Sequence, residues 1–128
     1  MARLLRLALG LTLWAGALAA QQQKPAEPPE EDESLLPKEY SFNPLQAEKE
    51  LKIGAFYFKR GRYRAAALRF QEATKWNPGL AEAYLRLGEA REKLKDQKAA
   101  RAAYAKFLEL APDHKRAVEI KRKLARTS

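Results

Sequence analysis

Residues 47–80 have the sequence AEKELKIGAFYFKRGRYRAAALRFQEATKWNPGL, and residues 81–114 continue with AEAYLRLGEAREKLKDQKAARAAYAKFLELAPDH. The two stretches are equally long, and residues of the same kind recur between them at a spacing of 34 positions. The recurring pairs are Ile53 and Leu87, Gly54 and Gly88, Ala66 and Ala100, Phe70 and Tyr104, and Pro78 and Pro112. A fixed period of this length indicates stacked copies of one supersecondary unit, so this region decides the fold.

Apolar residues recur at helical spacing through both stretches, and turn residues divide them into segments of helical length. Asn43 is suited to cap a helix that starts at Pro44, and Gly61 is suited to end it. Asn77-Pro78-Gly79 is a strong turn signal, and Ala111-Pro112-Asp113 is a second break. The pattern predicts an all-α fold with helices over about 44–60, 62–76, 80–94, 97–110 and 114–126.

The period and the matched residues resemble the tetratricopeptide repeat family, whose units are antiparallel helix-turn-helix pairs of 34 residues. Tyr84 and the pair Leu87-Gly88 follow the family pattern closely, and the recurring glycine lets two helices approach because any side chain would hold them apart. The resemblance implies a solenoid of two repeats and a cap. The implied domain spans 43–128, with repeats at 47–80 and 81–114 and a C-terminal capping helix at 114–126.

Several positions depart from the family pattern. Glu50 stands where a large aromatic residue is usual, which indicates that the first unit is a terminal one with a loosened start. Arg91, Lys95 and Gln97 replace the aromatic and glycine residues of the turn region, and Arg91 and Gln97 are expected to weaken the second unit there. Phe107 stands where a small residue is usual, and it predicts extra contact area against the last helix.

The last predicted helix has one narrow apolar stripe, formed by Ala117, Ile120 and Leu124. Most of its remaining surface is basic, through Lys115, Arg116, Lys121, Arg122, Lys123 and Arg126. A helix that closes a solenoid is expected to be amphipathic in this way. A basic helix on a membrane surface is the competing interpretation, but the narrow stripe contains no aromatic residue, which favours the cap.

Residues 1–20 have the pattern of a secretory signal peptide: a basic start, an apolar stretch and an end in small residues. Cleavage is expected after Ala19 or Ala20. An uncleaved anchor is the alternative, although the apolar stretch is short for a membrane span. Residue 21 is glutamine, so the cysteine that a bacterial lipid anchor needs at this position is missing. We therefore expect export to the periplasm or the extracellular space.

Residues 21–42 form a linker rich in proline, glutamine and acids, which is expected to be extended. Tyr40 and Phe42 at its end are expected to pack on the first helix pair. The net charge of +9 is uneven, because residues 45–128 carry 21 basic and 10 acidic side chains. Such a domain attracts anionic partners or its own acidic linker, although lysine and arginine are also ordinary on solvated helix faces.

Nothing in the sequence supports a catalytic, cofactor or metal site, so we expect no enzyme activity. The chain has no cysteine and one histidine, His114, and these cannot build a zinc site of the usual kinds. The few serines, Ser34, Ser41 and Ser128, lie outside the predicted helices, which argues against a Ser/His/Asp set. No glycine-rich phosphate loop is present.

The resemblance implies a non-catalytic scaffold that binds a protein or peptide on a concave face, lined by the first helix of each unit. Transferred by position, the lining residues are Glu48, Leu51, Ala55, Phe58 and Lys59 from the first unit and Glu82, Leu85, Glu89, Glu92 and Lys93 from the second. Leu51, Phe58 and Leu85 should be partly exposed there as an apolar row. Alternatively, they pack under the Tyr40–Phe42 segment or under the last helix.

Two units and a cap are close to the lower limit for a stable solenoid, so the aromatic segment, self-association or a larger partner is expected to help. The repeats are similar to those of bacterial outer-membrane assembly factors, an analogy of fold that suggests a place in the cell envelope. The alternative function is a basic adaptor for anionic lipid or nucleic acid. The expected export argues against nucleic acid and leaves a peripheral contact or an uncleaved signal as routes to a membrane.

Overall fold

The computed structural model describes residues 39–126, which fold into five α-helices joined by short turns. The helices are α1 (Pro44–Lys59), α2 (Tyr63–Trp76), α3 (Ala81–Lys93), α4 (Gln97–Leu110) and α5 (Ala117–Arg126). The predicted all-α fold class is confirmed. The predicted signal peptide and residues 21–38 of the predicted linker lie outside the described residues.

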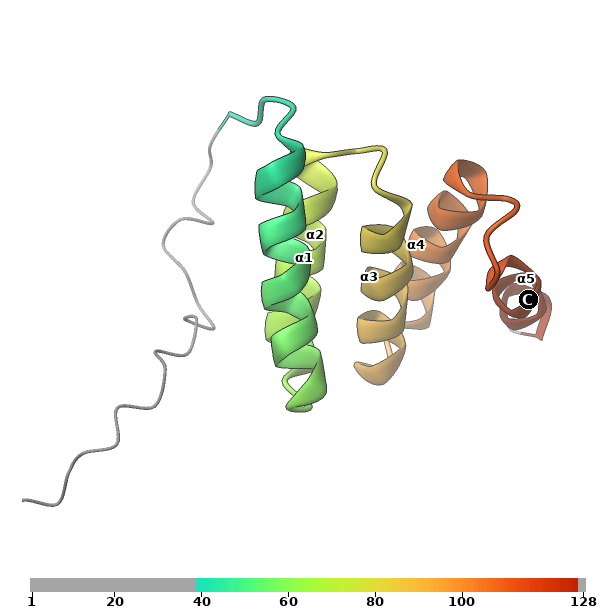
Figure 1. The fold of residues 1–128 in the computed structure, drawn as a ribbon. Coiled ribbons are helices and arrows are strands. Elements are labelled where there is room, and N and C mark those ends of the chain that lie inside the picture. Colours follow the sequence, from blue (N-terminus) through green and yellow to red (C-terminus); the bar gives the residue numbers. More distant parts are fainter. Residues whose placement is uncertain (1–38, 127–128) are drawn as a thin grey trace, which may run out of the picture.

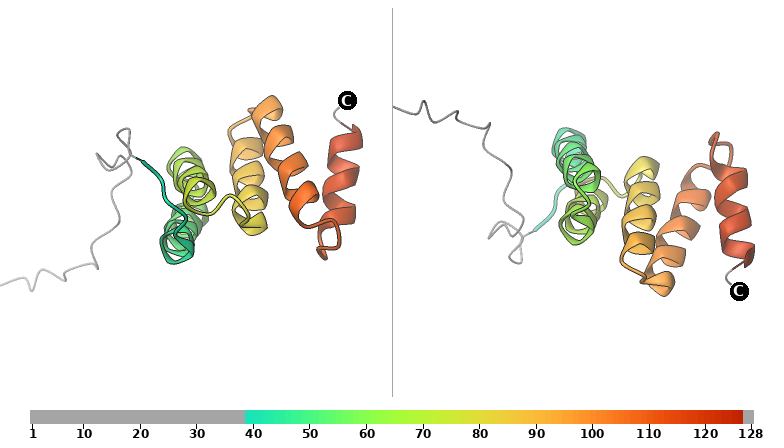
Figure 2. Two further views of the ribbon diagram at one scale, coloured as in Figure 1. Left: turned by 90° about the horizontal axis from the view of Figure 1, so that it is seen from above. Right: turned by 90° about the horizontal axis from the view of Figure 1, so that it is seen from below.

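The helices form one row of hairpins. Figure 1 shows α1 and α3 on the near side of the molecule, with α2 and α4 behind them. Figure 2 shows the row continuing into α5 at the far end from α1. α1 packs mainly on α2, α3 on α4, and α2 on α3, whereas α5 has a smaller contact with α4. Each hairpin therefore contacts mainly its neighbour along the chain, as in a solenoid.

The predicted helix boundaries are confirmed to within a residue or two for α1 to α4. Asn43 caps α1, because its side-chain oxygen accepts a hydrogen bond from the backbone nitrogen of Gln46 at 3.0 Å. Gly61 ends the hairpin's first helix with φ of +73°. The predicted start of α5 at His114 was too early, because His114 lies in the turn before the helix. The His114 ring stabilises this turn, since its Nδ1 atom accepts a hydrogen bond from the backbone nitrogen of Arg116 at 3.1 Å.

Polar contacts close the α3–α4 turn, where the family pattern has aromatic residues. Arg91 donates to the carbonyl oxygen of Ala99 at 3.2 Å, and Asp96 caps α4 by accepting from the backbone nitrogen of Ala99 at 3.2 Å. Gln97 begins α4 and is exposed. The sequence had suggested that these replacements weaken the turn, and that effect on stability remains a prediction.

Lys95 in this turn has φ of +63°, a conformation that L-residues other than glycine rarely adopt, at the position matching Gly61. A side chain in the left-handed region costs roughly 1–2 kcal/mol per residue. We expect Lys95→Gly to raise the free energy of unfolding by about 0.5–1 kcal/mol, after allowing for the extra freedom of glycine in the unfolded chain. Urea denaturation measures this change.

The matched control for this substitution is Lys49→Gly, which replaces an exposed lysine inside α1. Glycine in a helix interior lowers stability by about 1 kcal/mol, so the two lysine-to-glycine changes should have opposite signs. Equal losses of stability from both variants would contradict the assignment of strain to Lys95.

The core has two adjacent parts. The first is centred on Tyr57, Phe70 and Leu87, and it joins the two hairpins. The second is formed by Leu85, Ala100, Tyr104, Phe107 and Ile120. Phe107 is fully buried in this second cluster together with Ile120 of α5, so the predicted contact of Phe107 with the last helix is confirmed.

The recurring glycines lie at close contacts between the paired helices. A Cβ atom on Gly54 would lie 2.5 Å from the ring of Phe70, and one on Gly88 would lie 2.5 Å from the ring of Tyr104. Both rings are almost completely buried, so neither can move aside at low cost. The sequence-based explanation for these glycines, a close helix approach, is therefore confirmed.

Glu50 has buried partners in the first hairpin, and the loosening that the sequence suggests there remains a prediction. Its side chain is buried between α1 and α2, where one carboxylate oxygen accepts from Arg69 at 3.1 Å and the other from Gln46 at 2.9 Å. Arg69 is also buried, with 3% of its side chain exposed. An ion pair between two helices takes the place of the expected aromatic residue.

The segment before α1 attaches to α2 through Tyr40. The Tyr40 ring stacks edge-on against Trp76 with 5.0 Å between ring centres, and its hydroxyl donates to Glu72 at 2.8 Å. The expected packing of Tyr40 on the first helix pair is thus confirmed. For Phe42 the expectation was wrong, because its side chain is 72% exposed. The Asn43 nitrogen bonds to the Trp76 carbonyl at 3.0 Å, and this turn of the chain directs Phe42 outward.

Tyr40→Phe removes the hydrogen bond to Glu72 and keeps the ring, so we expect a loss of about 1 kcal/mol at neutral pH. The pKa of Tyr40 is raised from 10.0 to about 12, first by burial and then by the hydrogen bond to Glu72. The folded state thus favours the protonated hydroxyl, and this stabilisation is complete below pH 10 and lost as the pH rises to about 12. Denaturation of both proteins across this range should show their stability difference narrowing; a constant difference would contradict the role of the hydroxyl.

Candidate partner-binding face

The residues that the sequence predicts for the concave face lie on α1 and α3, and we call the surface of α1, α3 and α5 the inner face. On α1, the side chains of Leu51, Ala55 and Phe58 are half-buried. Leu51 and Phe58 rest on the first core cluster and keep part of their surface accessible. Glu48 and Lys59 are exposed at the two ends of this row. The α1 part of the predicted face therefore consists of accessible apolar side chains with charged ends.

Leu85 does not belong to the accessible surface. It is 1% exposed and lies in the second core cluster with Tyr104 and Ile120. The prediction that Leu85 lines the face is wrong, and the alternative that it packs under the last helix is correct. Ile120 of α5 belongs to the same buried cluster, because α5 follows α4 where a third repeat would begin.

Arg86 of α3 connects α3 to the apolar row of α1 on the inner face. Its guanidinium carbon lies 4.7 Å from the centre of the Phe58 ring, and its Nη1 atom lies 3.3 Å from Glu89. Phe58 also stacks edge-on against Tyr63 with 5.1 Å between ring centres. Phe58 is thus held between two hairpins, which places an aromatic side chain in a fixed orientation on the face.

The acids of α3 pair with basic groups of α5 and of the turn before it. Glu89 accepts from Arg116 at 3.2 Å, and Glu92 accepts from Lys123 at 2.9 Å. Glu82 is exposed, 3.8 Å from the ring nitrogen of His114, and Lys93 is exposed at the end of α3. The predicted row of acids on α3 is therefore largely neutralised within the chain.

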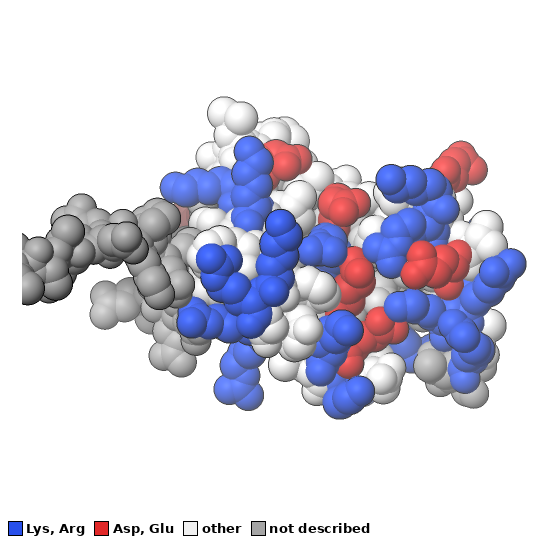
Figure 3. Space-filling model, turned by 60° about the horizontal axis from the view of Figure 1, so that its bottom comes forward, with Lys and Arg blue, Asp and Glu red and all other residues white. Residues whose placement is uncertain are grey.

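Sequence reasoning missed Arg86, Arg116 and Lys123 as members of this face. The last two could have been found, because continuing the spacing of 34 residues from Glu82 and Glu89 leads to Arg116 and Lys123. A hydrogen bond to Glu119 and then the charge of Glu89 raise the pKa of Arg116 above its usual value. Figure 3 shows several acidic side chains as a band through the middle of this view, with groups of lysine and arginine on either side and further acids among the basic groups on the right.

Within residues 39–126, no group of three His, Cys, Asp or Glu side chains is placed to hold a metal ion. Over the same residues, no helix combines the length and the apolar character that crossing a membrane requires. The hollows between helices are open to solvent. One of about 250 Å³ lies between α2, α3 and α4, and its walls include Tyr84, Leu87 and Arg91.

Comparison with known proteins identifies the repeat. The sequence model of a family described as tetratricopeptide repeat matches residues 57–124, which is more than half of the chain. The match starts in the last turn of α1 and ends within α5. No curated protein matches the chain.

Proposed function

The chain belongs to the tetratricopeptide repeat family, whose repeats generally mediate protein–protein interaction, and from this we propose that its inner face binds a peptide or protein segment. The observation that carries the proposal is the half-buried row of Leu51, Ala55 and Phe58 on α1. Accessible apolar side chains next to charged ones are typical of binding surfaces. The family is generally non-catalytic, in agreement with a binding role.

Binding is directed to the α1 side of the inner face. Glu89 and Glu92 on α3 are occupied by ion pairs with Arg116, in the turn before α5, and with Lys123 of α5, so a ligand would have to break these pairs to use them. A ligand can contact Leu51 and Phe58 without breaking these ion pairs. An extended or helical segment with an apolar side chain can contact both residues and gain free energy from the surface it covers, about 25 cal/mol per Å².

The proposed setting is the bacterial cell envelope. The signal-peptide pattern of residues 1–20 supports export, and the similarity of the repeats to those of outer-membrane assembly factors supports a scaffold role in that compartment. The partner in this proposal is a protein of the envelope, and self-association is one way to extend the short solenoid.

A photo-crosslinking experiment tests the proposal. A benzophenone analogue of phenylalanine replaces Phe58 in one variant and the exposed Phe42, outside the inner face, in the control. Irradiation of cells or envelopes is expected to yield discrete protein adducts from position 58 and not from position 42. Equal adduct patterns from both positions, or none from position 58, would refute binding on the inner face.

A salt titration separates this function from that of a basic adaptor for anionic lipid. Contact with the apolar α1 row should weaken only modestly between about 50 and 200 mM salt, whereas binding that rests on many released counterions weakens by orders of magnitude. Adducts from position 58 that disappear over this range would favour the adaptor.

A further inference from the structure

One face of α2 is open to solvent along its whole length. Arg64, Leu68, Gln71 and Lys75 are exposed at spacings that align on one side of a helix, and we call them the outer stripe. A hollow of about 180 Å³ lies on it, lined by Leu68, Gln71, Lys75 and the buried Glu72. Leu68 is 38% exposed, so the middle of the stripe is apolar.

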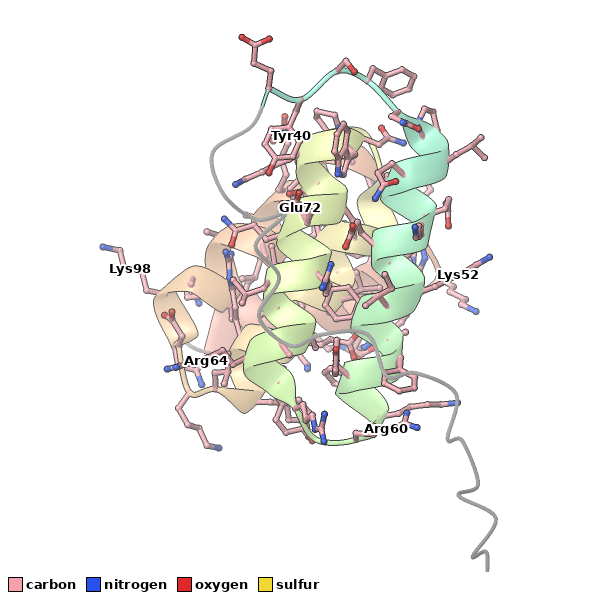
Figure 4. The ribbon with its side chains drawn as sticks, turned by 90° about the vertical axis from the view of Figure 1, so that its left-hand side faces the viewer. Tyr40, Lys52, Arg60, Arg64, Glu72 and Lys98 are labelled. Carbon is pink, nitrogen blue, oxygen red and sulfur yellow. The ribbon has the colours of Figure 1, made fainter. Side chains whose placement is uncertain are left out.

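Tyr40 brings the chain to the upper end of this stripe. Its hydroxyl donates to Glu72 at 2.8 Å, and the Lys75 ammonium group lies 5.4 Å from its ring centre. Both partners line the hollow on the outer stripe. Figure 4 shows Tyr40 and Glu72 together near one end of α2 and Arg64 toward the other end. The described chain therefore begins, at Glu39 and Tyr40, next to a residue that lines the hollow.

We propose that residues 30–38 of this chain dock along the outer stripe, with Leu35 and Leu36 over Leu68 and the acidic run 30–33 beside Arg64. Leu35 and Leu36 are the only large apolar residues between Gln21 and Lys38. Directly before them stand Glu30-Glu31-Asp32-Glu33 and Ser34. The order of the segment, acidic and then apolar toward Tyr40, matches the order of the stripe from its basic end to its apolar middle.

The distances allow this register. An extended chain advances about 3.3 Å per residue, so Leu36 reaches about 13 Å from Tyr40, and Glu33 about 23 Å. A helix rises about 1.5 Å per residue, which puts Leu68 about 6 Å and Arg64 about 12 Å along α2 from Glu72. The segment reaches both positions with length to spare, and it runs parallel to α2.

Charge favours the same register. Arg64 has no acidic partner among residues 39–126, and Lys98 at the start of α4 lies on the same side of the view in Figure 4. Single exposed ion pairs contribute little, about 0.2–1 kcal/mol. Most of the free energy of docking therefore has to come from the burial of Leu35 and Leu36 and from the covalent connection. The tether helps because a short covalent connection gives an effective concentration on the order of millimolar.

Docking would determine from which side of the domain the N-terminal part of the chain extends. The N-terminal part of the chain would leave the domain at the Arg64 end of α2, on the outer side, and would leave Leu51 and Phe58 on the inner face accessible. The proposal is independent of the partner-binding function, since it concerns a different surface and a segment of the chain itself.

Paramagnetic relaxation enhancement tests the docking in the full chain, which has no native cysteine to interfere with labelling. A nitroxide is attached at Ser34→Cys, and the amide signals of α1 and α2 are compared. Docking predicts strong broadening at residues 64–71 and much weaker broadening at the exposed Lys52 and Lys59 of α1. Mixing labelled chains with isotope-labelled, nitroxide-free chains shows whether the contact is within one molecule.

Two leucine substitutions give a matched comparison. Leu68 and Leu94 are exposed to similar extents, 38% and 41%, but only Leu68 lies on the outer stripe. Leu68→Ser should reduce the broadening at residues 64–71 severalfold, and Leu94→Ser should leave it unchanged. Equal broadening of α1 and α2, or no response to Leu68→Ser, would overturn the proposal. Broadening seen only between mixed chains would assign the stripe to a second copy and would also overturn it.

Discussion

Gly88→Ala is expected to lower the free energy of unfolding by about 3 kcal/mol, because the new methyl group overpacks a full core. The added Cβ would lie 2.5 Å from two ring atoms of Tyr104, which is 2% exposed and has no space to retreat. Helix propensity alone predicts the opposite sign, since alanine is favoured over glycine inside a helix by about 1 kcal/mol. The sign of the measured change in the free energy of unfolding therefore shows whether overpacking or helix propensity has the larger effect. Gly54→Ala, against Phe70, should behave in the same way.

Urea denaturation monitored by circular dichroism measures the loss. Gly79→Ala is the control, because a Cβ there would meet only the Asn77 side chain at 3.5 Å, an ordinary contact. Its effect should stay within about 0.5 kcal/mol, as for most surface substitutions. Combining Gly88→Ala with Tyr104→Leu should recover part of the loss by removing the ring. A stabilising Gly88→Ala would show that the two helices can separate without cost.

Glu50→Ala is expected to lower the free energy of unfolding by about 3–5 kcal/mol, because it leaves the Arg69 charge buried without this carboxylate. Glu50 and Arg69 have side chains 6% and 3% exposed, and water cannot readily replace the lost partner. Gln46 also loses its acceptor. A loss of this size is a large part of the roughly 5–15 kcal/mol that stabilises a typical domain.

An exposed pair provides the comparison for this variant. Lys106 and Glu109 on α4 lie 3.3 Å apart with side chains 40% and 68% exposed, and Glu109→Ala should cost less than about 1 kcal/mol. Replacing both partners, as Glu50→Leu with Arg69→Met, should restore part of the stability because neither charge of this pair then remains buried. Equal costs for Glu50→Ala and Glu109→Ala would mean that water reaches the buried pair.

Local signals predicted most of the fold. The boundaries of α1 to α4 follow from helical periodicity, from the Asn43 cap and from the turn residues, and each of these depends on neighbours a few positions away. The repeated glycines predicted close helix contacts, and the structure has them against Phe70 and Tyr104. On the candidate face, the α1 residues Leu51, Ala55 and Phe58 keep part of their surface accessible, and binding there stays a prediction.

Contacts between residues far apart in the sequence could not be predicted in this way. The Glu50–Arg69 pair spans 19 positions, Glu92–Lys123 spans 31 and Tyr40–Glu72 spans 32. The sequence does not show whether a glutamate will be exposed to water or paired with a buried arginine. The packing of two helices against each other decides between these two environments. The burial of Leu85 likewise depends on distant residues, because its cluster includes Tyr104 of α4 and Ile120 of α5.

The sequence by itself therefore determined the repeat, its period and its turns, because these arise from local propensity and from a spacing that is visible along the chain. The tertiary structure decided which of the matched positions remain accessible. It buried Leu85, paired Glu89 with Arg116 and Glu92 with Lys123, and left Leu51 and Phe58 partly accessible. The physical reason is that burial and ion pairing are properties of surfaces brought together by folding, and a position in a repeat does not specify what lies opposite it.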